Sequence, residues 1–244
     1  MRHVTTMTIT DAEHISPAQR EAIIASYPEH ERDARTKGIP TLGSGRIFPV
    51  AEDAITCDPI EIPAHWPQIG AMDFGINHPF AAVALAWDRD ADCVYVTKTH
   101  RVRGQTPILQ AAALKPWGDW LPWAWPHDGL ARDKGSARPL AEQYGDQGLD
   151  MLGEPATYED ERSNGVEAGL MDMLGRMQTG RWKVFRHLND WFGEFRLYHR
   201  KDGLVVKEAD DLMSASRYGL MMLRHAKVKM PVYSVPRHRG DWMS

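Results

Sequence analysis

The sequence predicts an α/β fold in which a mixed central sheet is flanked by helices, preceded by a short N-terminal helical and linker extension. Three strand-like segments, at 69–75, 81–87 and 93–100, are joined by short turns, which predicts an antiparallel meander. After residue 106, segments with helical periodicity alternate with short apolar runs, as in α/β domains. With 244 residues, of which 43% are hydrophobic, the chain is long enough for one large domain with an appendage.

The first part of the chain has the composition of an extension. Ser16, Pro17 and Gln19 form a capping box with proline at the first helical position, which predicts a helix over 17–26. A charged run over 29–37 and a loop rich in glycine and proline over 38–45 then indicate a linker. We therefore expect an N-terminal extension at 1–59, a main domain at 60–230 and a basic C-terminal tail at 231–244.

The remaining elements follow from the same signals. Pro107 begins one helix, while Asn164 and Gly180 are the predicted cap and stop of another, whose apolar residues recur at spacings of three and four. We expect helices over 106–115, 138–146, 165–178, 189–198 and 208–225, and strands at 121–125, 149–152, 182–186 and 204–206.

Composition and motifs exclude several classes of protein. No apolar stretch reaches the roughly 18 residues of a membrane span, and the first residues lack the apolar segment of a signal peptide, so we expect a cytoplasmic protein without a membrane partner. Cys57 and Cys93 are the only cysteines, which excludes a disulfide framework and a cysteine-rich zinc site. The dipeptide Gly-Lys does not occur, so the chain has no P-loop.

The net charge of −4 gives no overall attraction to nucleic acid. A local segment, 224–240, contains several lysines and arginines and no acid. It is either a patch that meets a polyanion or a solvated basic tail, and the sequence favours neither reading.

Four acids stand at the predicted ends of elements. Asp73 ends the first strand of the meander, Asp128 follows the tryptophan-rich strand, and Asp210 and Asp211 open the last helix. Carboxylates gathered at a sheet edge suit hard divalent cations, and two such ions can promote phosphodiester hydrolysis. The structural alternatives are an Asx-turn for Asp128 and favourable charge at a helix N-terminus for Asp210 and Asp211.

This spacing of acids is compatible with a ribonuclease H-like layout, with one acid on the first strand, a second after the fourth strand and a third on a late helix. Four motifs in order carry a more specific resemblance. They are 30–50 (HERDARTKGIPTLGSGRIFPV), 69–75 (IGAMDFG), 127–135 (HDGLARDKG) and 208–218 (EADDLMSASRY). Over roughly residues 28 to 226 the chain resembles the C-terminal nuclease part of the large terminase subunit of tailed bacteriophages.

The resemblance implies a ribonuclease H-like endonuclease of little sequence specificity that cuts concatemeric viral DNA during packaging, of the headful type, with one or two Mg²⁺ or Mn²⁺ ions. It makes Asp73 the first metal ligand and Asp128 the second. In the last motif, Ser214 stands where the family carries an acid. Asp210 or Asp211, one helical turn earlier, could replace that acid; Asp211 is slightly favoured and both remain open.

The resemblance also implies partners. These are double-stranded DNA, the terminase ATPase part, the small terminase subunit and the portal, with action at the procapsid in the bacterial cytoplasm and a monomeric isolated domain. The first fifty residues resemble the end of the ATPase part, so we expect a fragment of a longer protein. Contacts to DNA phosphates are assigned to Arg132, Lys134, Arg138, Arg224, Lys227 and Lys229.

Two other functions stay open at this point. One is a DNA-binding or portal-binding module whose isolated cleavage is negligible, suggested by Ser214 and by the net negative charge. The other is a ribonuclease H-like resolvase that acts on branched DNA.

Overall fold

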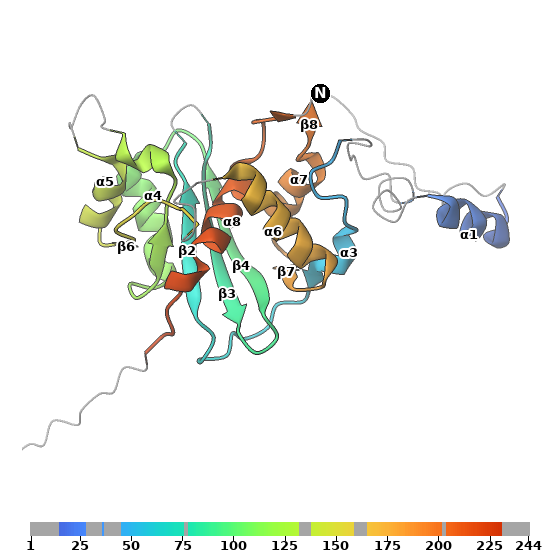
Figure 1. The fold of residues 1–244 in the computed structure, drawn as a ribbon, viewed down its shortest axis with the longest axis horizontal. Coiled ribbons are helices and arrows are strands. Elements are labelled where there is room, and N and C mark those ends of the chain that lie inside the picture. The colour runs from blue at the N-terminus through green and yellow to red at the C-terminus, as the bar shows by residue number, and fades with distance from the viewer. Residues whose placement is uncertain are drawn as a thin grey trace, which may run out of the picture.

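A computed structural model describes residues 15–27, 36, 45–75, 78–131, 138–158, 165–201 and 204–230. Its centre is a seven-stranded sheet with the order β1-β7-β4-β3-β2-β5-β6, flanked by helices (Figure 1). The pairings are parallel except those of β3, which runs opposite to the other six strands. The strands are β1 (Thr56–Cys57), β2 (Gln68–Asp73), β3 (Phe80–Asp88), β4 (Cys93–Val102), β5 (Pro122–Ala124), β6 (Asp150–Met151) and β7 (Trp182–Phe185).

The predicted antiparallel meander is confirmed by strands β2, β3 and β4. Asp73 lies opposite Ala81, and Ala81 lies opposite Arg101, so these three residues form one row across the sheet. Asp92 closes the turn between β3 and β4 with a positive φ of 45°, and its carboxylate accepts a hydrogen bond of 3.1 Å from Nε1 of Trp87. An aspartate tolerates this left-handed conformation better than most residues.

Helices cover both faces of the sheet (Figure 1). On one face α6, α7 and α8 pack on the larger hydrophobic core, and on the other α4 and α5 pack on a second core. The helices are α1 (Pro17–Ser26), α3 (Glu52–Ile55), α4 (Pro107–Leu114), α5 (Leu140–Asp146), α6 (Val166–Gln178), α7 (Asn189–Leu197) and α8 (Asp211–Met221). None of the described helices is both long enough and apolar enough to cross a bilayer.

Strand β2 contributes to both cores because its side chains alternate between the faces of the sheet. Ile69 and Ala71 belong to the core beneath α8, and Met72 belongs to the other. A β-carbon added at Gly219 of α8 would lie 3.1 Å from Cβ of Ala71 and 2.7 Å from a methyl group of Leu85. Small residues therefore let α8 lie directly on β2 and β3 and fix its position over the sheet.

Three predicted helix starts are wrong. Helix α5 begins at Leu140 and not at Arg138, because Pro139 is its N-cap. Helix α8 begins at Asp211 and not near 208, because Ala209 has a φ of 52°, in the left-handed region that a right-handed helix does not use. It ends at Met221, and a separate 3-10 turn, Leu223–His225, follows. The N-cap of α6 is Gly165 and not Asn164. Helix α1 and its capping box are confirmed, with a hydrogen bond of 3.4 Å from the Gln19 N–H to Oγ of Ser16.

The packed fold includes residues that precede the domain boundary expected at residue 60. Phe48 and Ile55 are fully buried in the larger core, and β1 pairs in parallel with β7. The sequence did not predict this pairing or the small hairpin of β8 (Arg200–Lys201) and β9 (Leu204–Val205). The expected C-terminal tail, 231–244, lies outside the described residues.

Candidate metal centre

Asp73 and Asp128 lie at the same edge of the sheet. Asp73 is the last residue of β2, and β5 runs parallel to β2 with Ala71 opposite Ala124. A 3-10 turn, His127–Leu130, follows β5 and carries Asp128 at the exposed carboxyl end of these strands. Open α/β sheets bind ligands at this edge.

Gly129 lets this turn approach β2 closely. A β-carbon at Gly129 would lie 2.7 Å from the ring of Phe74 and 2.5 Å from that of Trp125. Any larger residue would push the turn away from Phe74, which directly follows Asp73. The glycine next to Asp128 is therefore required by the contact that joins the two acid-bearing segments.

Helix α8 brings the other two acids to this edge. Asp210 is its N-cap residue and Asp211 its first helical residue. Ser214, at the position where the family pattern has an acid, is 8% exposed, and its backbone N–H donates to the Asp210 carbonyl at 2.8 Å. The structure thus brings all four predicted acids to one end of the molecule.

The acids interact electrostatically. Burial raises the pKa of Asp73 to about 8, and the carboxylates of Asp210, Asp211 and, more weakly, Asp128 act in the same direction, while the Arg217 guanidinium acts against them. Burial and the neighbouring Asp211 also raise the pKa of Asp210. This is the pattern of like charges that share a poorly solvated site.

Asp211 differs from the other three acids because it forms an ion pair with an arginine, Arg101. Nη2 of Arg101 lies 3.1 Å from Oδ2 of Asp211, whose side chain is 8% exposed. Arg101 stands on β4, two strands away from Asp73, which corresponds to about 10 Å across a sheet. Asp211 is therefore held on the β4 side of the site.

Sequence reasoning missed Arg101 and Glu194. Nε of Arg101 lies 2.8 Å from Oε1 of Glu194, a residue of α7 that is 3% exposed. Burial raises the pKa of Glu194 to about 7, and its hydrogen bond from the Leu212 N–H opposes this rise. The available signal was the position of Glu194 between Trp191 and Phe195, on the apolar side of a predicted helix.

The donor set consists of carboxylate oxygens, which suits hard divalent cations such as Mg²⁺ or Mn²⁺. Among the described residues, however, no three His, Cys, Asp or Glu side chains are close enough together to form a ready metal cluster. The acids interact through their charges but do not stand at ligation distances. Repulsion between the carboxylates favours these longer separations, and a bound cation would reduce the repulsion.

Three of the predicted DNA-binding residues are already paired, namely Arg138, Arg224 and Lys227. Arg138 precedes α5 and bonds Asp146 and Glu142 of that helix. Arg224 bonds Glu154 and two backbone carbonyls, and Lys227 pairs with Asp150. Arg132 and Lys134 lie outside the described residues.

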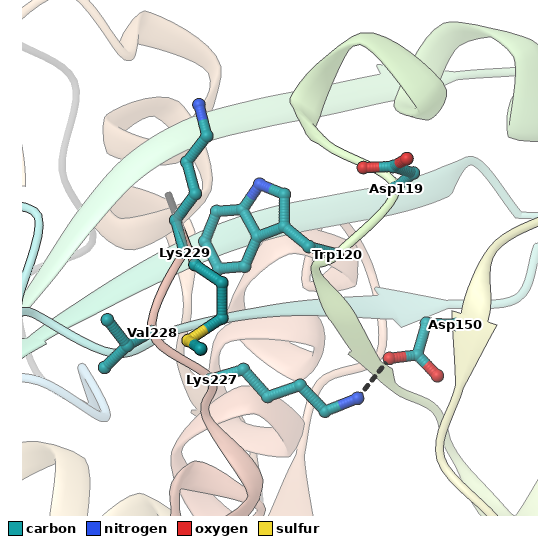
Figure 2. A pocket seen from close by; sticks show the side chains of 7 residues that line it. Asp119, Trp120, Asp150, Lys227, Val228 and Lys229 are labelled. Atoms are coloured by element: carbon teal, nitrogen blue, oxygen red, sulfur yellow. Dashed lines mark hydrogen bonds and ion pairs between the residues drawn. The ribbon is translucent and has the colours of Figure 1, made fainter. Parts of the chain in front are cut away.

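Lys227 and Lys229 line a cavity of about 320 Å³ with Trp120 and Asp150 (Figure 2). Lys227 pairs through its backbone with Gln68, the first residue of β2, so the cavity lies at the end of that strand opposite Asp73. The cavity is therefore separate from the four predicted acids, Asp73, Asp128, Asp210 and Asp211.

A comparison with protein families decides the identity. Residues 70–223 match the terminase RNaseH-like domain, which covers more than half of the chain. The chain therefore belongs to the terminase large-subunit family. Residues 1–54 match the N-terminal model of the T4likevirus-type large terminase subunit. The expected family and the ribonuclease H-like α/β fold are both confirmed.

Two individual relatives support the family assignment. The chain is 48% identical over 226 residues to the terminase large subunit of Salmonella phage P22 and 49% identical over 220 residues to that of Enterobacteria phage LP7. These matches cover 92% and 90% of this chain but 45% and 46% of the relatives, so the chain spans less than half of their length.

Solved structures show the same fold. The P22 large terminase nuclease domain matches with a TM-score of 0.71 and 44% identity, over 76% of this chain and 96% of that domain. The large terminase of a thermophilic bacteriophage matches with a TM-score of 0.60 and 14% identity, over 89% of this chain and 55% of that chain. The large terminase nuclease of the thermophilic phage G20c with bound cobalt matches with a TM-score of 0.50 and 18% identity, over 72% of this chain and 97% of that chain.

Proposed function

We propose that this terminase nuclease domain is a divalent-metal-dependent DNA endonuclease that hydrolyses phosphodiester bonds with little sequence preference. The observation that carries the proposal is the convergence of Asp73, Asp128 and Asp210 at the carboxyl edge of β2 and β5. The raised pKa of Asp73 supports it, because buried carboxylates that repel one another are stabilised by a cation.

Asp73, Asp128 and Asp210 would hold the ion, Mg²⁺ or Mn²⁺, through carboxylate oxygens. One or two such ions would supply an activated water and would stabilise the charge on the leaving oxygen of a phosphodiester. Arg217, which is 4% exposed, lowers the pKa of Asp73 and so favours its ionised, ligating form. Cobalt, a divalent ion of the same general class, is bound in the related G20c domain.

Asp210 is our choice for the third ligand, although the sequence slightly favours Asp211. Among the carboxylates that raise the pKa of Asp73, that of Asp210 has the largest effect. The carboxylate of Asp211 is engaged by Arg101 at 3.1 Å, and a metal ion would have to compete with this guanidinium.

DNA would approach the same edge of the sheet. Arg132 and Lys134 follow Asp128 closely in the chain, and we keep them as phosphate contacts together with Arg138, whose side chain is half exposed. Contacts to the phosphate backbone position a duplex but carry no sequence information. To bind the same duplex, the side chains of Arg224, Lys227 and Lys229 would have to leave or share the contacts that they now make.

The role in the whole virus is also a proposal, because the chain spans less than half of its curated relatives. We propose that the domain cuts concatemeric viral DNA during headful packaging. In that process it would act beside the ATPase part, the small terminase subunit and the portal, in the bacterial cytoplasm.

A second candidate is a DNA-binding or portal-binding module with negligible cleavage of its own. Two observations favour it: the acids of the described residues are spread beyond ligation distances, and Ser214 replaces the acid of the family pattern. In that case the active site would form only with the motor or the portal.

Cleavage of supercoiled plasmid by the purified chain, in Mg²⁺, Mn²⁺ or EDTA, separates these candidates. We expect metal-dependent nicking that is lost in Asp73→Asn and Asp210→Asn and reduced but measurable in Asp211→Asn. Asp92→Asn removes an acid from the turn between β3 and β4 and is the matched control, which should cut like the wild type.

Each other outcome has a definite meaning. DNA that shifts on a native gel but is cut under no condition would support the binding module. Cleavage of a four-way junction in strong preference to linear duplex would support a resolvase. Loss of cleavage in Asp211→Asn with full activity in Asp210→Asn would reverse our assignment of the third ligand.

A further inference from the structure

The N-terminus of α8 is capped from outside the helix. The N-cap residue, Asp210, is of a type that commonly caps its own helix, yet its side chain makes no such bond. Instead, Oε2 of Glu194 accepts hydrogen bonds from the backbone N–H groups of Leu212, at 2.6 Å, and Met213, at 3.3 Å. A glutamate on α7 thus caps the helix, and the Asp210 carboxylate is not used for this purpose.

The same glutamate also orients Arg101. Its second oxygen, Oε1, lies 2.8 Å from Nε of Arg101, and the far end of that guanidinium reaches Asp211 at 3.1 Å. One carboxylate therefore links α7, β4 and α8 at the edge where Asp73 lies. Its side chain is only 4% exposed; Oε2 accepts two hydrogen bonds, whereas Oε1 has the ion pair with Arg101 and no hydrogen bond.

The position of α8 depends on this link. Gly219 fixes the C-terminal half of the helix against Ala71 of β2, and the first turn buries Leu212 and Met213 in the same core. The hydrogen bonds to Glu194 and the ion pair of Arg101 with Asp211 also hold this turn. Asp210 directly precedes Asp211 as the N-cap of α8, so contacts that hold Asp211 also restrict the backbone that carries Asp210.

We propose that Glu194 is a positioning residue of the metal centre: it caps α8 in place of Asp210 and, with Arg101, fixes the start of the helix, which carries Asp210 and Asp211. This inference rests on the proposed metal-dependent nuclease. Removal of groups that orient metal ligands commonly costs about tenfold to a hundredfold in metal affinity.

The test variant is Glu194→Gln, which removes the negative charge of the side chain and keeps its shape. The glutamine carbonyl can still accept from Leu212, but the amide N–H₂ then faces the Arg101 guanidinium. We expect the Mn²⁺ concentration for half-maximal plasmid nicking to rise about tenfold or more, with much of the rate restored at saturating metal. Calorimetric titration of the metal-free chain with Mn²⁺, without DNA, should show the same loss of affinity.

Glu52→Gln is the matched control. Glu52 lies on α3 and is partly buried. It pairs at 2.6 and 2.7 Å with Arg196, which lies on α7, the helix that also carries Glu194. It should change the melting temperature without changing the Mn²⁺ dependence.

Arg101→Gln separates positioning from simple charge, and it also serves if Glu194→Gln does not fold. Removing a cation beside the acids should tighten Mn²⁺ binding if only charge matters, whereas our proposal requires it to weaken. Tighter binding in Arg101→Gln, or an unchanged Mn²⁺ dependence in Glu194→Gln, would overturn the positioning role alone. A wild-type chain that neither binds Mn²⁺ nor cuts DNA would instead overturn the proposed function and this inference with it.

Discussion

Replacing Asp73 by asparagine should make the metal-free protein more stable at pH 8 and hardly change it at pH 4. Burial and the neighbouring acids raise the pKa of Asp73 from its usual 3.8 to about 8. The folded protein therefore binds this proton more tightly than the unfolded chain. The free energy of unfolding is highest below pH 4 and falls as the pH rises toward 8, because the unfolded chain has then released a proton that the folded protein retains. Asparagine carries no charge at any of these pH values and removes this dependence.

The size of the effect follows from the pKa. At 1.36 kcal/mol for each pH unit, the full rise corresponds to roughly 6 kcal/mol above pH 8. Solvent reaches part of this carboxylate and screens its neighbours, so we expect about 2 kcal/mol at pH 8. Glu194, whose pKa is raised to about 7, adds a dependence of the same sign, but it is present in both proteins and cancels in the comparison.

Urea unfolding in EDTA at pH 4, 6 and 8 measures the difference directly. Asp92→Asn is a control of opposite sign, since ion pairs with Arg176 and Arg181 hold the pKa of Asp92 below its usual value. Its replacement should destabilise the protein, by less than about 1 kcal/mol for so exposed a group. Adding Mn²⁺ at pH 8 should stabilise the wild type more than Asp73→Asn. Equal stability of wild type and Asp73→Asn at pH 8 would refute the reasoning, because Asp73 would then not be a buried carboxylate among like charges.

Three further predictions concern packing and binding. Gly219→Ala should lower the free energy of unfolding by about 1 to 3 kcal/mol in urea titration, because its β-carbon would meet Leu85 and lift α8 from the sheet; unchanged stability would show that α8 is not packed this closely. Trp191→Phe should cost about 2 kcal/mol in the same titration, since it removes the 2.9 Å hydrogen bond to Ser216 and leaves space in the core; a free energy of unfolding equal to that of the wild type would show that α7 and α8 are not joined by this contact. The affinity for duplex DNA should fall linearly on a plot of log K against log salt, as measured by fluorescence anisotropy, and a slope near zero would contradict backbone recognition.

The sequence was sufficient where local patterns decide the structure. Alternating apolar residues and short turns predicted the meander, and with it the position of Asp73 at a strand end, because each strand pairs with its neighbour in the chain. The pairing of β1 with β7 joins Thr56 to Val184, residues far apart in the chain, and no local pattern reports it. Glu194 was missed for the same reason, since its partners lie on β4 and α8 and only the assembled fold brings them together.

The choice between Asp210 and Asp211 shows where sequence reasoning ends. From the sequence, helical spacing places both acids near the face of Ser214. In the structure Asp210 is the N-cap, with a φ of −124° and a ψ of 8°, so its direction depends on the local backbone and not on helical spacing. Gly219 sets the distance between α8 and β2, and Ala209, with its left-handed backbone, prevents the helix from starting earlier. The hydrogen bonds to Glu194 hold the first turn of α8. Gly219 and Glu194 lie outside the family motif at 208–218, whereas Ala209 lies within it. If Asp210 is the third ligand, as we propose, its placement depends in part on residues outside the motif, and a family member with an acid in place of Ser214 would not need the same support.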